Sequence, residues 1–476
     1  MRTLIEHLDF ACTVNGSDEV IKDAAVLIED QWIADIGSTT ELHKRHTRGT
    51  IDKIIDGTLI GICPGFVDTH VHLSETLSRA AFPDHLNTRT WVFHWAKPFY
   101  AHVNEEDEYI SVLLGATEML RAGTTCFLDM GAQNDPGVTV RAIEQVGMRG
   151  ITGRHAADNP PEQLPKGWSE EMVAHHFFPD TQTALRELED CVRRWDGSAG
   201  GRIRCWVNIE GKEPCSLELH VGARALAEKL GVGTTYHLAT SIEEADVCQR
   251  KHGCWPLTRI ANAGGLGSNL VIAHGAAISD DEVALLARHD TRVAFCPGTS
   301  LKLGKGATCI GKYPEMIDAG VTVGLGTDGV SASGNLNLMR QMYAVAGLFK
   351  DARNDPTAIG ARQALRMATI DGARALDWDR EIGSLEVGKR ADFILFDLDH
   401  VEWTPYTDPL QALVWSATSA SIIETWVDGQ ALYREGRVQT VDETALKQEA
   451  RERAAAIVER AGLEFDHGPS STSLYD

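Results

Sequence analysis

Short apolar segments alternate with amphipathic stretches through the middle of this chain, from about residue 63 onward. This alternation is typical of parallel β/α units, because each helix returns the chain to the start of the next strand. Eight segments have the character of strands: GFVDTHVH, TTCFLDM, MRGITGR, RIRCWVNIE, GTTYHLAT, NLVIAHG, RVAFCP and VTVGLGTD. From His70 in the first to Asp328 in the last, they span close to the ~250 residues typical of a (β/α)8 barrel. A barrel is therefore favoured over an open sheet.

The stretches between these segments have helical spacing. In EEDEYISVLLGATEMLRAG, Asn104 can cap the first turn and Gly123 can end the helix. Further helices are predicted in TALRELEDCVRRW, VGARALAEKLG, DEVALLARH and KYPEMIDAG, and at about 335–350 and 356–376.

Both ends of the chain are rich in β-like runs. These runs occupy residues 1–62 and return in ADFILFDL and IIETWVDGQALYREGRV. We expect residues 1–62 and 380–440 to form one side domain beside a barrel at 63–379. Residues 441–476 are expected to add a C-terminal helix and a tail, with a thin apolar stripe on the helix made of Leu446, Ala450, Ala454, Ile457 and Ala461.

The net charge of the chain limits the classes of partner that it is expected to bind. The chain carries 45 basic and 68 acidic residues, a net charge of −23, which disfavours binding to nucleic acid and to anionic membranes. The N-terminal sequence lacks the pattern of a secretion signal, and no uninterrupted apolar stretch reaches ~18 residues. Ten cysteines without a C-x-x-C pair indicate reduced thiols. We expect a cytoplasmic protein that acts on a small molecule, with a homo-oligomer as the default assembly.

Polar side chains end several of the predicted strands, where a barrel places its active site. His70 and His72 end the first strand, and alternation points both to the same face. His237, His274 and Asp328 end three later strands. Each alone is better explained as a hydrogen-bonded core residue or a turn residue. Together they suit a divalent transition metal, with zinc expected first and cobalt, nickel or iron as alternatives.

These motifs resemble the amidohydrolase superfamily. The resemblance rests on PGFVDTHVH, the later His237, VIAHG, VGLGTDG, MATIDGARAL and GSLEVGKRADFILFDL, and it covers about residues 20–440. It is strongest to the branch of cytosine deaminases, adenosylhomocysteine deaminases and s-triazine hydrolases. The resemblance implies an α/β fold, a distorted (β/α)8 TIM barrel with a small composite β-sandwich domain from both chain termini.

The resemblance also assigns roles to residues. It implies that His70, His72, His237 and Asp328 hold one metal ion that activates water. Asp328 is then expected to take the proton of that water and pass it to the leaving nitrogen, while His274 hydrogen-bonds near the metal.

One position departs from the deaminase pattern. That branch carries a Glu three residues after the histidine that matches His237, whereas this chain has Thr240. A threonine can hydrogen-bond a substrate but is no acid near neutral pH, so ordinary heterocycle deamination is placed in doubt. Glu243 or Glu244 can compensate only through a shifted loop, and a solvated helix start is the plainer interpretation of both.

Other residues remain open between a role in the site and an ordinary one. Lys212 follows the fourth strand, where the resemblance to other amidohydrolases implies a carboxylated lysine that holds a second metal together with His274; alternatively, Lys212 is an exposed loop residue. Arg154 ends the third strand and can bind substrate or form a structural salt bridge. Trp91 and Trp95 in TWVFHWAKPFY can wall the pocket or belong to a packed helix. The G-x-G-x-x-G match in GLGTDG is weak, because Asp328 would place a carboxylate in a phosphate cradle.

The sequence thus predicts a metal-dependent hydrolase acting on carbon–nitrogen bonds other than peptide bonds. The first hypothesis is release of ammonia or an amine from a small N-heterocycle. The alternative is hydrolysis of an amide, urea or carbamate, with a binuclear centre bridged by carboxylated Lys212. A third hypothesis, of another class, is a non-catalytic barrel scaffold, which the complete set of ligand positions disfavours.

Overall fold

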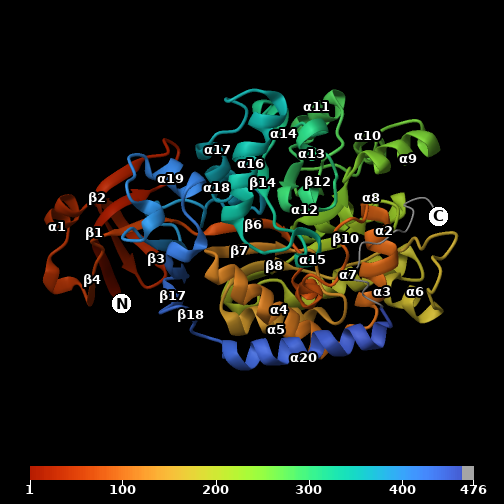
Figure 1. Cartoon of the computed structure of the whole chain (residues 1–476), viewed down its shortest axis with the longest axis horizontal. Coiled ribbons are helices and arrows are strands. Elements are labelled where there is room, and N and C mark those ends of the chain that lie inside the picture. The colour runs from red at the N-terminus through yellow and green to blue at the C-terminus, as the bar shows by residue number, and fades with distance from the viewer. Residues whose placement is uncertain (464–476) are drawn as a thin grey trace.

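The computed structural model describes residues 1–463, which form an α/β fold with two parallel sheets (Figure 1). The four-stranded sheet has the order β6-β7-β8-β9, with bounds Phe66–Val71, Thr124–Asp129, Arg149–Thr152 and Ile203–Cys205. The five-stranded sheet has the order β10-β11-β12-β13-β14, with bounds Val207–Gly211, Thr234–Leu238, Leu270–His274, Arg292–Phe295 and Val323–Leu325. All eight predicted segments contain strands.

The fourth predicted segment, however, is two strands rather than one. It divides at Trp206, whose N–H donates to the carbonyl oxygen of Thr152 at 2.9 Å, whereas the N–H of Val207 donates to Gly233 at 3.1 Å. The chain therefore changes its hydrogen-bonding partner between β8 and β11. A Cβ on Gly233 would lie 2.5 Å from the Trp206 ring, so the turn before β11 requires glycine. This break in one segment separates the two parallel sheets.

Two isolated parallel bridges join the sheets. Val71 pairs with Asp328, and Ala156 pairs with Ile209. The N–H of Asp328 also donates to the carbonyl oxygen of His70 at 2.8 Å. The chain just after β14 is thereby held against the end of β6.

The helices follow the predicted spacing. In α4 (Glu105–Arg121), Asn104 caps the helix and Asp107 bonds back to the Asn104 backbone. The other predicted helices are α7 (Thr181–Trp195), α8 (Leu217–Leu230), α11 (Asp280–His289), α14 (Tyr313–Asp318), α16 (Leu338–Arg353), α17 (Ala361–Met367) and α18 (Ile370–Ala375). The remaining helices are α1 (Thr39–Arg45), α2 (Thr88–Thr90), α3 (Lys97–Tyr100), α5 (Pro136–Val146), α6 (Glu170–His176), α9 (Ile242–His252), α10 (Pro256–Asn262), α12 (Pro297–Lys302), α13 (Ala307–Ile310), α15 (Val330–Ser333) and α19 (Pro409–Trp415). Short 3-10 turns lie at Arg48–Thr50, Leu73–Ser78, Ala199–Gly201, Val401–Trp403 and Ser419–Ser421.

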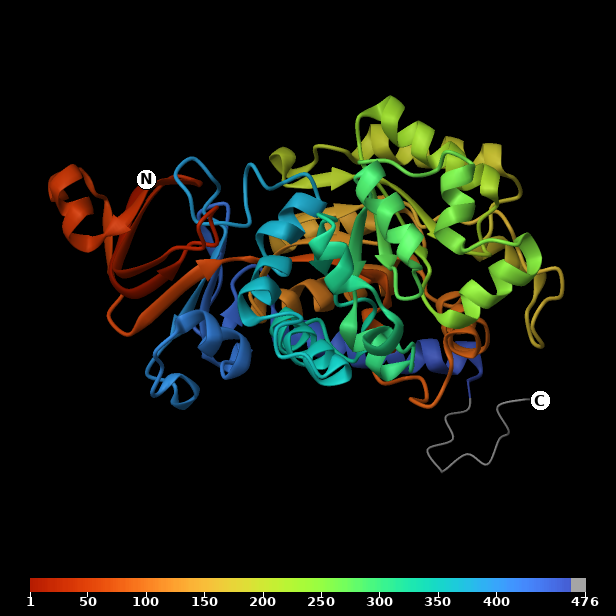
Figure 2. The same ribbon diagram turned by 90° about the horizontal axis from the view of Figure 1, so that it is seen from above.

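A third sheet takes strands from both ends of the chain. It has nine strands, in the order β18-β17-β16-β15-β5-β1-β2-β3, with β4 also paired to β1. The bounds are β1 Arg2–Cys12, β2 Val20–Glu29, β3 Trp32–Ser38, β4 Lys53–Asp56, β5 Ile60–Pro64, β15 Phe393–Asp397, β16 Ile422–Val427, β17 Gln430–Arg434 and β18 Arg437–Val438. Figure 2 shows the first and last parts of the chain side by side, to one side of the helix-covered parallel sheets. β5 ends two residues beyond the predicted boundary at 62.

The C-terminal helix α20 (Glu443–Ala461) lies along α4. Leu446, Ala450 and Ile457 of its predicted stripe are buried. Arg453 and Arg460 both form ion pairs with Asp107, at 3.1 and 2.5 Å. The predicted tail at 464–476 lies outside the described residues. Within residues 1–463, no helix combines the length and the apolar character that crossing a bilayer takes.

A buried ion pair connects the four-stranded sheet to the sheet of the two termini, and its loss should be costly. Arg149 at the start of β8 bonds Asp392 at 3.0 Å, and both side chains are 1% exposed. Arg149→Met leaves the Asp392 carboxylate buried without its partner, which should cost about 3–5 kcal/mol of unfolding free energy. Urea denaturation should show this loss. Arg193→Met breaks only an exposed pair with Glu189 and should change stability by less than about 1 kcal/mol; equal effects of the two substitutions would contradict the prediction.

Candidate metal centre and its cavity

The carboxyl ends of four strands bring the predicted histidines and Asp328 together. His70 lies in β6 with His72 just beyond it, His237 lies in β11, and His274 ends β12. Asp328 follows β14 by three residues. His274 and Asp328 have backbone φ angles of 74° and 61°, a left-handed conformation that non-glycine residues adopt at a cost and that is concentrated at functional sites. Hydrogen bonds hold Asp328 in this conformation.

Four of these side chains fit one cation. Donor atoms of His70, His72, His237 and Asp328 all lie within 4.8 Å of one another. The Nε2 atoms of His72 and His237 are 3.2 Å apart, and Asp328 Oδ1 is 3.4 Å from His70 Nε2 and 3.3 Å from His72 Nε2. Four ligands placed about 2.1 Å from a tetrahedral zinc lie about 3.4 Å from one another, which matches these distances.

The protonation of the histidines also suits a cation. His237 Nδ1 is 2.6 Å from the carbonyl oxygen of Glu210. A carbonyl can only accept, so Nδ1 carries the proton and Nε2 keeps its lone pair for a metal. His70 is fully buried, and neither of its ring nitrogens has a hydrogen-bond partner among the described residues. A bound cation would satisfy one of these nitrogens.

Burial sets the charges around this centre. Burial lowers the pKa of His70, and it holds the pKa of His237 and His274 well below the usual range. For Asp328, burial opposes ionisation, but the close contact with His70 and the other nearby imidazoles outweigh it and keep its pKa well below the usual range. Burial likewise disfavours the charged form of His72, yet Glu75 at 3.2 Å raises the His72 pKa to about 9. The centre thus offers neutral imidazoles and one carboxylate, with His72 as the group from which a metal must displace a proton.

Buried polar side chains fix the positions of the ligands. The Asp68 carboxylate accepts from the backbone N–H groups of His70 and Thr327, both at 3.1 Å, and from the Thr327 hydroxyl at 2.5 Å. It therefore locks the residue before Asp328 onto the strand that carries His70. Such support is what holds metal ligands in place before an ion binds.

His274 lies next to the four donors and belongs to a second group. Its Nε2 is 3.7 Å from Asp328 Oδ2. Together with Asp328 and Cys296, it places one donor atom each within 4.8 Å of the others. His274 can therefore hydrogen-bond a water near the metal, or share in a second metal.

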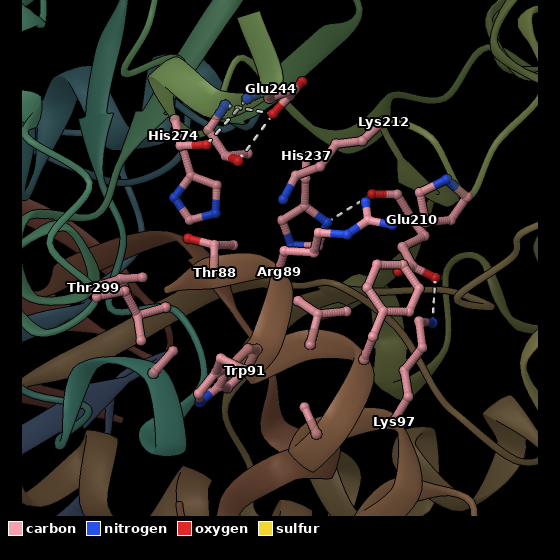
Figure 3. Close-up of a pocket in the computed structure, with 18 of the residues that line it drawn as sticks. Thr88, Arg89, Trp91, Lys97, Glu210, Lys212, His237, Glu244, His274 and Thr299 are labelled. Carbon is pink, nitrogen blue, oxygen red and sulfur yellow. Dashed lines mark hydrogen bonds and ion pairs between the residues drawn. The ribbon is translucent and has the colours of Figure 1, made fainter. Parts of the chain in front are cut away.

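A cavity of about 160 Å³ opens over this centre (Figure 3). One wall is the segment from Thr88 to Tyr100, in which a π-helical turn at Trp91–Ala96 joins α2 to α3. Trp91, Phe93 and Tyr100 from this segment line the cavity. The segment is therefore helical and also forms a wall of the cavity, while a contact of Trp91 or Trp95 with a substrate stays a prediction.

The predicted substrate residues divide between this cavity and other places. Trp91 and Thr240 line it. Trp95 is not among the lining residues and lies by Phe82, with ring centroids 6.2 Å apart. Arg154 also lies elsewhere, because its Nη1 donates to the carbonyl oxygens of Ala132 and Asn134, both at 2.8 Å. Within residues 1–463, Arg154 forms no salt bridge and does not line this cavity; its guanidinium instead holds two backbone carbonyls, and its contact with a substrate stays a prediction.

Lys212 and Glu244 both line the cavity, although the sequence also allowed an exposed loop lysine at 212 and a solvated helix start at 244. Lys212 directly follows β10, is half-buried and lines the cavity, so it is no ordinary exposed loop lysine. Glu244 does lie in the first turn of α9, but its carboxylate turns back and lines the cavity. It accepts from the N–H of Ala239 at 2.9 Å, and from the N–H and hydroxyl of Thr240 at 2.8 and 2.9 Å.

Several lining residues were missed from the sequence. Lys97 and Glu210 form an ion pair at 2.7 Å in the wall, with both side chains nearly buried. Glu210 ends the fourth predicted strand, the same signal that singled out the histidines. His155 and His176 also line the cavity, and Lys305 comes from a loop with no strand signal.

Comparisons with known proteins agree with this geometry. A model of the amidohydrolase family matches residues 62–432. The chain is 33% identical to a 5'-deoxyadenosine deaminase of Methanothermobacter thermautotrophicus, over 92% of this chain and 95% of that protein. It is 30% identical to a 5-methylthioadenosine/S-adenosylhomocysteine deaminase of Syntrophomonas wolfei, over 96% of this chain and all of that protein.

Solved structures have the same fold. An adenosine deaminase from Xanthomonas campestris with bound zinc superposes with a TM-score of 0.84 at 26% identity, covering 96% of this chain and 98% of that one. An atrazine chlorohydrolase from Arthrobacter aurescens complexed with zinc gives a TM-score of 0.83 at 22% identity, covering 95% and 100%.

Proposed function

Because the chain belongs to the amidohydrolase family, we propose that it is a metal-dependent hydrolase that cleaves a carbon–nitrogen bond, other than a peptide bond, in a small N-heterocycle. Ammonia or an amine is the leaving product. The observation that carries this proposal is the convergence of three imidazoles and one carboxylate beneath an aromatic-walled cavity. The two relatives reported above, at 33% and 30% identity, are named deaminases, which release ammonia by cleaving a carbon–nitrogen bond.

The proposed metal ligands are His70, His72, His237 and Asp328. We propose one divalent transition metal, zinc first, with iron, cobalt or nickel as alternatives, and the zinc bound in the adenosine deaminase of similar fold supports that order. When bound, such an ion lowers the pKa of a coordinated water towards neutrality.

The chain's own residues then handle the proton. Asp328 is charged and faces His274 through its second oxygen, Oδ2, at 3.7 Å. In our proposal Asp328 accepts the proton of the attacking water and delivers it to the leaving nitrogen, while His274 orients that water by a hydrogen bond. The Glu210 carbonyl keeps His237 in the tautomer that this arrangement requires. Trp91 excludes solvent from one side of the substrate and offers a flat apolar face to a ring.

A second candidate is hydrolysis of an amide, urea or carbamate, and it is favoured because every lining glutamate except the exposed Glu243 is engaged by other side chains or backbone groups. A ring nitrogen needs a nearby acid, whereas an attacked carbonyl does not. Glu210 is paired with Lys97, Glu213 with Arg89, and Glu75 accepts from the Tyr100 hydroxyl at 2.9 Å. Glu244 is engaged by three donors, so it does not replace the acid that Thr240 lacks. In the binuclear form of this candidate, carboxylated Lys212 and His274 would hold the second metal.

We expect Glu244 to act as a positioning residue and not as the acid. Glu244→Gln keeps the size of the side chain but replaces one accepting oxygen with an NH2 that faces a donor, which should loosen the turn after His237. The expected loss in kcat/KM is about 10-fold, with the shape of the pH profile of kcat unchanged. A loss of more than about 1,000-fold together with a missing limb of that profile would instead identify Glu244 as the acid. Asp246→Asn, at an exposed position of α9 that does not line the cavity, is the control.

The architecture proposed around this site is a distorted (β/α)8 barrel at 63–379 and a composite β-sandwich of 1–62 and 380–440, followed by the helix and tail at 441–476. The two sheet-joining bridges and the shared nine-stranded sheet support it. We further propose a cytoplasmic homo-oligomer, in keeping with ten cysteines that are all free thiols.

Two measurements test the proposed function. Elemental analysis of the purified protein should find one transition metal per chain for the mononuclear centre, or two, with a carbon dioxide adduct on Lys212, for the binuclear one. The loaded protein is then assayed for ammonia or amine release from heterocyclic amines, ureas, carbamates and amides. Absence of a transition metal together with absence of activity on every class would overturn the proposal and favour a scaffold.

A further inference from the structure

Lys305 is an inward-facing residue between two exposed glycines. It follows α12 and lies between Gly304 and Gly306, whose φ angles of 59° and 72° are left-handed. Both glycines are exposed, whereas Lys305 is only 6% exposed. Its N–H donates to the Ser300 carbonyl at 3.0 Å, and the Ser300 hydroxyl accepts from Ala307 at 3.1 Å. The loop is thus shaped to turn this one side chain into the cavity.

The ammonium of Lys305 lacks the partner that a buried charge requires. The charged and titratable groups that face it are Lys212, Asp328, Cys296 and Glu244. Within residues 1–463, none of these or any other group forms an ion pair or hydrogen bond with its Nζ, although the side chain lines the cavity. Burial, with the like charge of Lys212, lowers the pKa of Lys305 to about 8. Because the side chain lines the cavity and its ammonium has no fixed partner, the three N–H donors of Nζ are available to a ligand that enters there.

Two other cations that line the cavity, Lys97 and Arg89, differ in this respect, whereas Lys212 lines it without an ion pair or side-chain hydrogen bond within residues 1–463. Lys97 is neutralised by Glu210 at 2.7 Å, and Arg89 by Glu213 at 3.2 Å. Because these two cations are already paired with carboxylates, they are poor partners for a substrate oxygen. Lys305 lies on the Asp328 side of the cavity, where the two groups interact electrostatically and where His274 is also close enough to be affected by its charge. A fixed cation beside the group that receives the water's proton can stabilise negative charge forming on the attacked carbon's oxygen.

We propose that Lys305 is a catalytic residue whose ammonium hydrogen-bonds the carbonyl oxygen of the substrate, so that the substrate class is an amide, urea or carbamate. This inference rests on the proposed function, namely water attack at the centre that contains Asp328, and it selects between the two candidate reactions.

The step balances without another reactant. The oxygen of water bonds to the carbonyl carbon while its proton goes to Asp328, and the π-electron pair of the carbonyl moves to its oxygen. The Lys305 ammonium hydrogen-bonds the resulting oxyanion and keeps its own proton. When that electron pair returns, the carbon–nitrogen bond breaks and Asp328 gives its proton to the leaving nitrogen. One water and one carbonyl compound yield one acid and one amine.

The kinetic test uses zinc-loaded full-length protein with small 4-nitroanilides, 4-nitrophenylureas and 4-nitrophenylcarbamates, and with heterocyclic amines as the comparison class. For carbonyl compounds, Lys305→Met should lower kcat by at least about 100-fold while KM changes by less than about 3-fold. Lys305→Arg should recover about 10-fold of the loss, because it restores the charge. Lys312→Met is the matched control, since Lys312 lies nearby in sequence, pairs with Asp280 at 3.0 Å and does not line the cavity.

A binding test decides the role of Lys305 without turnover. Inorganic phosphate, a tetrahedral oxyanion, is titrated calorimetrically into the zinc-loaded protein and its variants. Binding by Lys305→Met should be at least about 10-fold weaker than by the wild type, while Lys312→Met should bind normally. Zinc content is measured in every sample and should be the same.

The outcomes separate the two proposals. Carbonyl hydrolysis that survives Lys305→Met within about 2-fold overturns the role of Lys305 and leaves the proposed function standing. Turnover of heterocyclic amines alone also overturns the inference but not the proposed function. If no compound of either class is turned over, the proposed function fails, and phosphate binding then tests Lys305 alone. Weaker phosphate binding by Lys305→Met than by the wild type supports the anion-binding role. Equal binding by the two proteins, or no binding by the wild type, overturns it.

Discussion

Replacing Asp328 with asparagine should lower kcat by about 10⁴-fold with either class of substrate. The amide is close in size to the carboxylate but has no basic oxygen to take the water's proton. It also removes the negative charge that lies 3.3–3.7 Å from His70, His72 and His274. Both losses affect the attack of water on the substrate, so we expect no other single substitution to lower kcat as much. Steady-state kinetics on the first substrate identified is the measurement.

The control for this substitution is Asp318→Asn, because Asp318 ends α14 at an exposed position. It should leave kcat within about 2-fold of the wild type. Zinc content is measured alongside, and the activity of Asp328→Asn is compared at full metal occupancy. If the fully loaded variant kept more than a tenth of the activity, Asp328 would be a ligand only and another group would have to move the proton.

Removing the metal should abolish activity and also destabilise the fold. Dialysis against a chelator such as dipicolinate should reduce activity more than about 1,000-fold, and one equivalent of zinc should restore it. Because the ion binds only the folded chain, zinc at about 1,000 times its dissociation constant adds about 4 kcal/mol of stability, visible as a higher melting temperature by calorimetry.

A ligand variant shows whether this response belongs to the proposed centre. His237→Ala should melt at the same temperature with and without zinc, whereas His94→Ala, at an exposed position of the aromatic segment, should keep the full shift. A zinc-dependent shift that persists in His237→Ala would locate the stabilising metal somewhere else.

The strands and the proposed ligands could be predicted because their signals are local. An apolar run that ends in a polar residue marks both a strand and the end of that strand, as at His274 and Asp328, and a barrel gathers those ends. The break at Trp206 could not be predicted in the same way. It depends on which neighbour each side of the segment bonds, Thr152 before the break and Gly233 after it, and both lie far away in the chain.

Loop residues were harder to predict for the same physical reason. Arg154 ends a strand as the histidines do, yet its long side chain reaches two backbone carbonyls rather than the cavity. Glu244 was expected to face solvent in a first helical turn, but three donors from the loop before it turn the carboxylate inward. In both cases the direction of the side chain is set by tertiary partners that leave no periodic pattern in the sequence.

The division of the parallel strands into two sheets has a consequence for motion. His70 and His72 belong to the four-stranded sheet, whereas His237 and His274 belong to the five-stranded sheet and Asp328 follows its last strand. An ion bound by ligands from both sheets connects the four-stranded sheet to the five-stranded sheet. Zinc should therefore slow amide hydrogen exchange in β6 and β11 together. These two strands, although remote in the chain, should then undergo local unfolding as one cooperative unit.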